Sequence, residues 1–112
     1  MDNVGFNKQL KKTYLNDTTK SVSVNLIKME GKKPLDSVSD FLSADWLIDK
    51  SKEALKPGET NKDTSAGLQV SLSKDNRTLV VTNPNNKTKG SVKITAMVNG
   101  QKYSTVIKVK KK

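Results

Sequence analysis

Four aspartates of this sequence come closest to the spacing of a metal site. They are Asp36, Asp40, Asp45 and Asp49, which follow one another at steps of four or five residues, close to one helical face. Ca²⁺ takes roughly six to eight oxygen ligands, so carboxylates grouped in this way could bind it. However, the sequence contains no Asp-x-Asp-x-Asp-Gly loop. We therefore interpret the group as a solvated acidic face, whose functional alternative is contact with the basic half of a neighbouring copy.

The sequence lacks the side chains on which many catalytic and metal sites depend. It contains no His and no Cys, which excludes imidazole and thiol mechanisms, Cys/His zinc sites and disulfides. Ser and Lys are plentiful, but no motif places them together, and the glycines are isolated rather than grouped in a phosphate-binding loop. We therefore predict that the protein is not an enzyme and has no cofactor.

Positive charge is concentrated in the second half of the chain. The net charge is +10, and residues 64–112 hold ten cations but a single anion, Asp75. Such asymmetry indicates an anionic partner. Three of these cations, Lys93, Lys102 and Lys108, fall at positions that alternate with apolar residues, so we expect them on one surface of a sheet and choose them as candidate partner-binding residues.

These lysines have three interpretations. They could protect a sheet edge and keep the protein in solution, contact an acidic protein shell, or bind the phosphates of a nucleic acid without reading its sequence. Base recognition usually depends on Arg side chains and stacking aromatic residues, and Arg77 is the only arginine of the chain. The sequence therefore disfavours nucleic acid and leaves the first two interpretations open.

Trp46 is the only tryptophan and also has two interpretations. It could be an exposed platform on which a sugar stacks, or a core residue that fills the space between two sheets. Since aromatic residues make up only 4% of the chain, an extended carbohydrate platform is poorly supplied, and we predict that Trp46 lies in the core.

The elements that position these residues are short strands. A length of 112 residues fits one domain. Alternation of apolar and polar residues predicts strands over 19–29, 68–72 and 78–82, and a short apolar run predicts another at 45–49. Residues 35–44 are ambiguous and favour a short helical or irregular turn, and a long polar loop follows at 50–66.

The end of the chain carries the clearest signal. Asn99-Gly100 lies between two alternating runs and predicts a type I′ β-hairpin. A two-residue turn would pair Val98 with Gln101, Ala96 with Tyr103, Ile94 with Thr105 and Val92 with Ile107 on one face. On the other face it would pair Met97 with Lys102, Thr95 with Ser104 and Lys93 with Val106. The first face is nearly all apolar and the second mostly polar, so turn and periodicity agree.

The first 20 residues are polar and rich in lysine. We predict that residues 1–20 form an extended N-terminal arm that becomes ordered on a partner. Its candidate anchors are the apolar side chains Phe6, Leu10, Tyr14 and Leu15. Residues 21–112 are then an all-β, immunoglobulin-like antiparallel β-sandwich, because short strands with turns between them are typical of that fold. No secretory signal or membrane segment is recognisable.

From Trp46 onward, several segments resemble a known family. They are Asp45-Trp46-Leu47, Leu68-Gln69-Val70-Ser71-Leu72, Asn86-Lys87-Thr88-Lys89-Gly90, and the strands over Ser91–Val98 and Tyr103–Val109. This pattern resembles the BACON family, immunoglobulin-like modules abundant in Bacteroidetes and their phages, crAss-like phages among them.

The resemblance implies a structural role. A complete single-module chain would suit an auxiliary or decoration protein of a phage capsid, located in the virion and bound to the major capsid protein, other virion proteins or further copies of itself. The alternatives are a carbohydrate-binding or adhesive module at a bacterial cell surface and a small basic DNA-associated protein.

Overall fold

Strands form where small and β-branched apolar residues alternate with polar ones. The computed structural model describes residues 3–6, 14–31, 33–34, 44–61, 64 and 66–111, and among these residues it contains nine strands and no helix. The strands are β1 (Asn3–Phe6), β2 (Ser21–Glu30), β3 (Lys33–Pro34), β4 (Asp45–Ile48), β5 (Thr60–Asn61), β6 (Gln69–Leu72), β7 (Thr78–Thr82), β8 (Lys89–Val98) and β9 (Gln101–Lys110).

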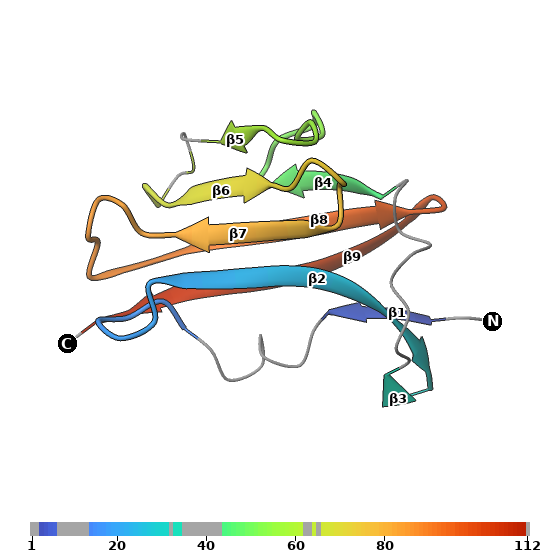
Figure 1. The fold of residues 1–112 in the computed structure, drawn as a ribbon, viewed down its shortest axis with the longest axis horizontal. Helices are drawn as coiled ribbons and strands as arrows, with labels where there is room; N and C mark the ends of the chain where they lie inside the picture. The colour runs from blue at the N-terminus through green and yellow to red at the C-terminus, as the bar shows by residue number, and fades with distance from the viewer. Residues whose placement is uncertain are drawn as a thin grey trace.

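The described strands form two antiparallel sheets that pack against each other (Figure 1). One sheet has the order β1-β2-β7-β6-β5, with β3 paired to β2, and the other has the order β4-β8-β9. The fold is therefore an all-β antiparallel sandwich, as the sequence predicted. Figure 1 shows β8 and β9 as the longest hairpin, behind β7 and β2.

The core lies between the sheets, where strands such as β6 and β7 bury every second side chain. β6 and β7 alternate strictly between half-buried and buried residues. Among the described residues, eleven large side chains are less than 2% exposed, and all but Leu15 and Leu68 come from strands of the two sheets: Trp46, Leu15, Leu26, Leu68, Leu79, Ile94, Ile107, Val24, Val70, Val81 and Val92. Burial of such apolar surface is the main term that stabilises a domain of this size.

The predicted hairpin is confirmed pair by pair. β8 and β9 pair from Val98 with Gln101 through to Lys89 with Lys110, in the register expected from the two-residue turn. Asn99 and Gly100 have φ of 52° and 79°, the left-handed values that this turn requires. Val92, Ile94, Ala96 and Val98 are all buried, so the apolar face is the inner one.

Other predicted elements differ from the observed ones by a few residues at most. The strand predicted at 78–82 is β7, and those predicted at 19–29, 45–49 and 68–72 correspond to β2, β4 and β6. The turn predicted over 35–44 lies outside the described residues, except for Ala44, which is buried.

The segment interpreted as a polar loop over 50–66 contains more structure than expected. Its short strand β5 extends the larger sheet by pairing with β6. Leu55 is buried, and its main-chain N–H donates to the carbonyl of Trp46 at 2.8 Å. Leu55 therefore covers the outer edge of β4 and belongs to the core.

The N-terminal segment includes one residue whose expected role is corrected. Leu15 was expected to anchor a partner, but its side chain is fully buried in this chain's own core. Its main chain also forms a parallel bridge with Val109. The sandwich therefore takes in Leu15 as well as β1, both of which precede residue 21. Leu15 joins it because the edge of β9 offers both hydrogen bonds and an apolar site.

Candidate functional site

The outer surface of the β4-β8-β9 sheet holds the three candidate lysines. Lys93 lies opposite Val106, Lys102 opposite Met97 and Lys108 opposite Ser91. All three lysines are exposed, whereas the residues next to Lys93 and Lys108 on the inner face, such as Val92 and Ile107, are buried. The register thus brings the three lysines to one surface, as the sequence predicted, and we call this surface the lysine face.

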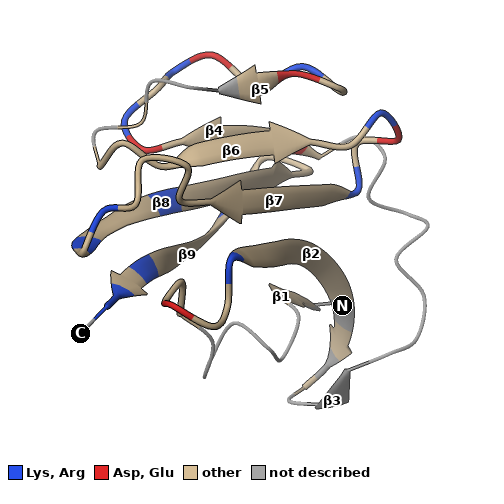
Figure 2. Cartoon of the chain, turned by 60° about the vertical axis from the view of Figure 1, so that its left-hand side comes forward, with Lys and Arg blue, Asp and Glu red and all other residues tan. Residues whose placement is uncertain are grey.

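The cations continue toward the open end of the hairpin. Lys89 pairs with Lys110, and both side chains are exposed. Figure 2 shows the blue of Lys and Arg on the bodies of β8 and β9. Five lysines on two adjacent strands create a positive potential that no single residue would produce.

The centre of the lysine face carries no charge and consists of hydroxyl side chains and one exposed apolar side chain. Thr95 is 8% exposed, lies between Leu47 of β4 and Ser104 of β9, and shares a hydroxyl–hydroxyl hydrogen bond of 3.0 Å with Ser104. Beside it, Val106 is 46% exposed, the one large hydrophobic side chain among the described residues with such exposure. A ligand of this surface would therefore meet cations around a small apolar and hydroxyl centre.

The acidic residues of β4 and its turn lie at the margin of this surface. Asp45 is exposed and pairs with Met97. Asp49 follows the strand in a left-handed conformation with φ of 52°, and its Oδ1 accepts a hydrogen bond of 3.0 Å from the main-chain N–H of Lys93. This carboxylate therefore closes the turn after β4 against β8.

The outer surface of the larger sheet has a different composition. At the positions paired between β2, β7 and β6, its residues are Ser21, Ser23, Asn25, Thr78, Val80, Thr82, Gln69 and Ser71. None of these is charged, and the strand bodies of β2, β6 and β7 show no blue or red there in Figure 2. We call this surface the neutral face.

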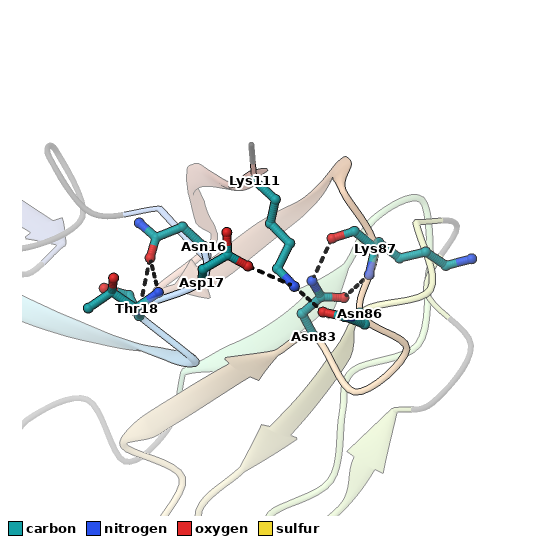
Figure 3. Close-up of polar contacts among 8 residues, drawn as sticks. Asn16, Asp17, Thr18, Asn83, Asn86, Lys87 and Lys111 are labelled. Atoms are coloured by element: carbon teal, nitrogen blue, oxygen red, sulfur yellow. Dashed lines mark hydrogen bonds and ion pairs between the residues drawn. The ribbon is translucent and has the colours of Figure 1, made fainter.

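A groove lies at one end of the sandwich, between the turn at 16–20 and the loop at 82–86, with Lys111 beside it. Its volume is about 320 Å³. Figure 3 shows how its polar groups are engaged: the ammonium of Lys111 lies 3.3 Å from the Asp17 carboxylate and also donates to the Asn86 side-chain oxygen. The side chain of Asn83 bonds to both the N–H and the C=O of Lys87, each at 2.9 Å.

These contacts indicate that the polar groups around the groove join segments of the chain to one another. Asn16 Oδ1 accepts from the main-chain N–H groups of Thr18 and Thr19 at 2.8 and 2.7 Å, which fixes the turn that leads into β2. Lys111 then ties that turn to the loop after β7. The arrangement holds the C-terminal end of β9 beside both segments.

Tyr14 and Phe6, two of the remaining N-terminal candidates, contact different parts of the sandwich. The ring of Tyr14 is 4.2 Å from the ammonium of Lys110, a cation–π contact. Phe6 is half-buried and packs against the core, and Leu10 lies outside the described residues. Their role as anchors for a partner stays a prediction.

Trp46 is in the core, as predicted. It is 1% exposed, and its Nε1–H donates to the main-chain oxygen of Asn76 at 3.1 Å. Asn76 in turn donates from Nδ2 to the carbonyl of Ala44 at 2.7 Å. Trp46 is therefore not available for a sugar to stack on, and the sequence alone gave no signal for its partner Asn76, which lies 30 residues away.

The described residues contain neither a metal site built from carboxylates nor a membrane-spanning helix. No group of three or more Asp and Glu that could hold a metal ion occurs in the part of the chain that the structure describes, in which Asp36 and Asp40 are not included. The same described residues contain no helix long and apolar enough to cross a membrane.

No family model, curated protein or solved structure matches this chain. The resemblance to BACON modules therefore stays an expectation based on the sequence segments given above, and the functional argument depends on the surfaces of the sandwich.

Proposed function

We propose that this protein is a non-enzymatic structural protein of a phage particle, an auxiliary or decoration protein that docks on an acidic capsid surface through its lysine face. The sequence resemblance suggests the phage setting, and the charge distribution suggests the chemistry of the partner.

The contrast between the two outer surfaces carries this proposal. If lysines served only to keep the sandwich in solution, both solvent-facing sheets would be expected to share them. Instead, Lys93, Lys102 and Lys108 lie on one sheet, and the positions paired between β2, β7 and β6 of the other sheet are uncharged. A one-sided charge pattern is what a surface needs in order to approach an oppositely charged partner in one orientation.

The lysines suit a shell better than a nucleic acid or a small ligand. Lys is a mobile point charge that raises the rate of encounter without demanding a planar partner. The only arginine, Arg77, is in the loop before β7 and not on the lysine face. The rigid body between the two surfaces lets the protein add thickness and stability to a shell without any chemistry of its own.

The carbohydrate alternative loses its main candidate residue. That hypothesis required an exposed Trp46, and the side chain is buried. Glycan binding would therefore have to use a surface that does not include Trp46, and no observation among the described residues favours one.

The experiment is to purify phage particles that carry the gene and measure the copy number of the protein in them by quantitative mass spectrometry. We expect a fixed stoichiometry to the major capsid protein and release of the protein at high salt. Absence from intact particles would contradict the proposal. Binding to duplex DNA that weakens steeply with salt, together with no binding to empty shells, would instead favour the DNA-associated alternative.

A further inference from the structure

The outer edge of β9 has main-chain groups that point away from β8. Leu15 identifies them: its N–H donates to the carbonyl of Lys108 at 3.0 Å, and its carbonyl accepts from the N–H of Lys110 at 2.8 Å. Residues 108 and 110 therefore direct their main-chain groups outward. Because this direction repeats at every second residue of an antiparallel ladder, Lys102, Ser104 and Val106 also present their N–H and C=O groups to the edge.

This edge is unpaired between Lys102 and Val106 among the described residues. No main-chain hydrogen bond reaches these three residues from another described segment, and β9 is the last strand of its sheet. All three side chains are exposed. Leu15 shows at the next ladder step, at Lys108 and Lys110, that the same edge accepts an extended segment.

The side chains along this edge define the chemistry of such a segment. On the outer surface, an added strand would lie beside Lys102, Ser104 and Val106, next to the step at Lys108 that Leu15 occupies. On the inner side it would lie beside Tyr103 and Thr105, which are half-buried, with Tyr103 packed against the core. Opposite charges on adjacent strands attract, so acidic side chains suit the outer positions and apolar ones the inner positions.

The same charges disfavour a second copy of this chain as the occupant. Pairing of β9 with β9 of another copy would bring lysines of two proteins with net charge +10 beside one another. Edge lysines commonly prevent such pairing. The edge therefore disfavours pairing with a second copy, whereas its charge suits an acidic chain, and no strand among the described residues pairs with it between Lys102 and Val106.

We propose that the edge of β9 from Lys102 to Val106 binds an extended acidic segment of a partner protein by strand addition, in which acidic and apolar residues alternate. This inference rests on the proposed function, because it states how the acidic shell is held: its charges meet the lysine face and its backbone completes the β4-β8-β9 sheet.

The first experiment uses the unaltered protein and a synthetic peptide, acetyl-Glu-Val-Glu-Val-Glu-Val-Glu-amide. A control peptide has the same sequence but is N-methylated at alternate residues, so that it lacks the main-chain N–H donors of those residues. Amide hydrogen exchange followed by NMR should slow at Ser104 and Val106 by about tenfold or more with the first peptide only. Binding without this protection would overturn the proposal. Slow exchange at both amides in the free protein would also overturn it, since the edge would already be paired.

The second experiment removes one outward donor. Ser104→Pro deletes an N–H that does not pair with β8, whereas Ser104→Ala keeps the N–H and removes only the hydroxyl. We expect the peptide affinity to fall about tenfold or more for Ser104→Pro and less than about threefold for Ser104→Ala. Equal affinities of the two variants would overturn strand addition; if Ser104→Pro does not fold, the exchange experiment on the unaltered protein decides.

Failure of this inference is distinguishable from failure of the proposed function. If empty shells bind the unaltered protein and Ser104→Pro equally well, the shell is the partner and the edge is not its site. If the unaltered protein binds the peptide at this edge but is absent from particles, the edge binds acidic segments and the capsid role is wrong. If the edge binds no acidic peptide, its lysines serve only to prevent strand pairing, and the inference is overturned.

Discussion

The two sheets of this sandwich have similar inner faces and contrasting outer faces. Inside, β2, β7 and β6 contribute Val24, Leu79 and Val70, and β8 contributes Val92 and Ile94, all fully buried. Outside, the positions paired between β2, β7 and β6 are uncharged and mostly hydroxyl or amide side chains, and lysines lie on the second sheet. The inner alternation determines that the chain folds as a sandwich. The outer residues do not have to be apolar for the chain to fold, so the contrast between the two outer faces is the feature that can indicate function.

The largest effect is expected where the two sheets are alike. Ile94→Ala and Leu79→Ala each remove a fully buried side chain, one from each sheet. Each should lower the free energy of unfolding by about 2–5 kcal/mol, because lost burial and the cavity add together. Urea denaturation measures both. A small loss for one substitution and a large loss for the other would show that the two inner faces do not form one core.

The next effect concerns the contact that ties the sheets together. Trp46 of β4 donates to the carbonyl of Asn76, which lies in the turn between β6 and β7. Trp46→Phe keeps an aromatic ring but removes the donor, and should cost about 1–3 kcal/mol of unfolding free energy. The measurement is again chemical denaturation. An unchanged stability would mean that this hydrogen bond does not join the sheets.

A smaller loss of unfolding free energy is expected in the turn between β8 and β9, which differs from the turn between β6 and β7 of the other sheet. Gly100, in the turn between β8 and β9, has φ of 79°, and a Cβ there would meet nothing within 4 Å. Gly100→Ala should therefore cost about 1 kcal/mol through backbone strain alone. Gly100→Asn should recover part of this loss, because Asn tolerates positive φ better. Equal losses in thermal unfolding would contradict the assignment of the cost to φ.

The smallest effect is expected in the turn between β6 and β7. This turn is held by side-chain hydrogen bonds, whereas the turn between β8 and β9 depends on the positive φ of Gly100. Ser73 donates to the Asp75 carboxylate, and the N–H of Arg77 donates to it as well, so the pKa of Asp75 is lowered from 3.8. A lowered pKa in the folded state stabilises the protein above the unfolded pKa, and this contribution is lost as pH falls through the folded pKa.

NMR titration of the Asp75 carboxyl group tests this difference between the turns. Its midpoint should lie below the usual aspartate range, and Ser73→Ala should raise it. A midpoint that Ser73→Ala does not move would show that the hydroxyl is not the cause.

The hairpin and the core tryptophan could be predicted because their signals are local. Asn99-Gly100 requires one turn type, and the turn fixes the register of every pair up to Lys89 with Lys110. Trp46 begins the apolar run Trp46-Leu47-Ile48 in a chain with few other large side chains to fill a core. In both cases neighbouring residues were enough to decide the structure.

Leu15 and Leu55 could not be predicted in the same way. Each is an apolar residue in a polar segment without periodicity, and each is buried because a distant strand offers it a main-chain partner: β9 for Leu15 and β4 for Leu55. Likewise, the sequence places the three lysines on one surface, but it does not show that the positions paired between β2, β7 and β6 form an uncharged surface on the other sheet. That contrast requires the strand order.

The most direct test of the account makes the lysine face resemble the neutral face. The triple variant Lys93→Thr, Lys102→Thr, Lys108→Thr removes three charges from the face, and the matched variant Lys50→Thr, Lys52→Thr, Lys56→Thr removes three from the exposed loop before β5. Each change should alter stability by less than about 0.5 kcal/mol. The association rate with empty shells at low salt should fall by about tenfold or more for the face variant and by less than about twofold for the loop variant. Equal rates for the two variants would contradict the claim that this face binds the partner.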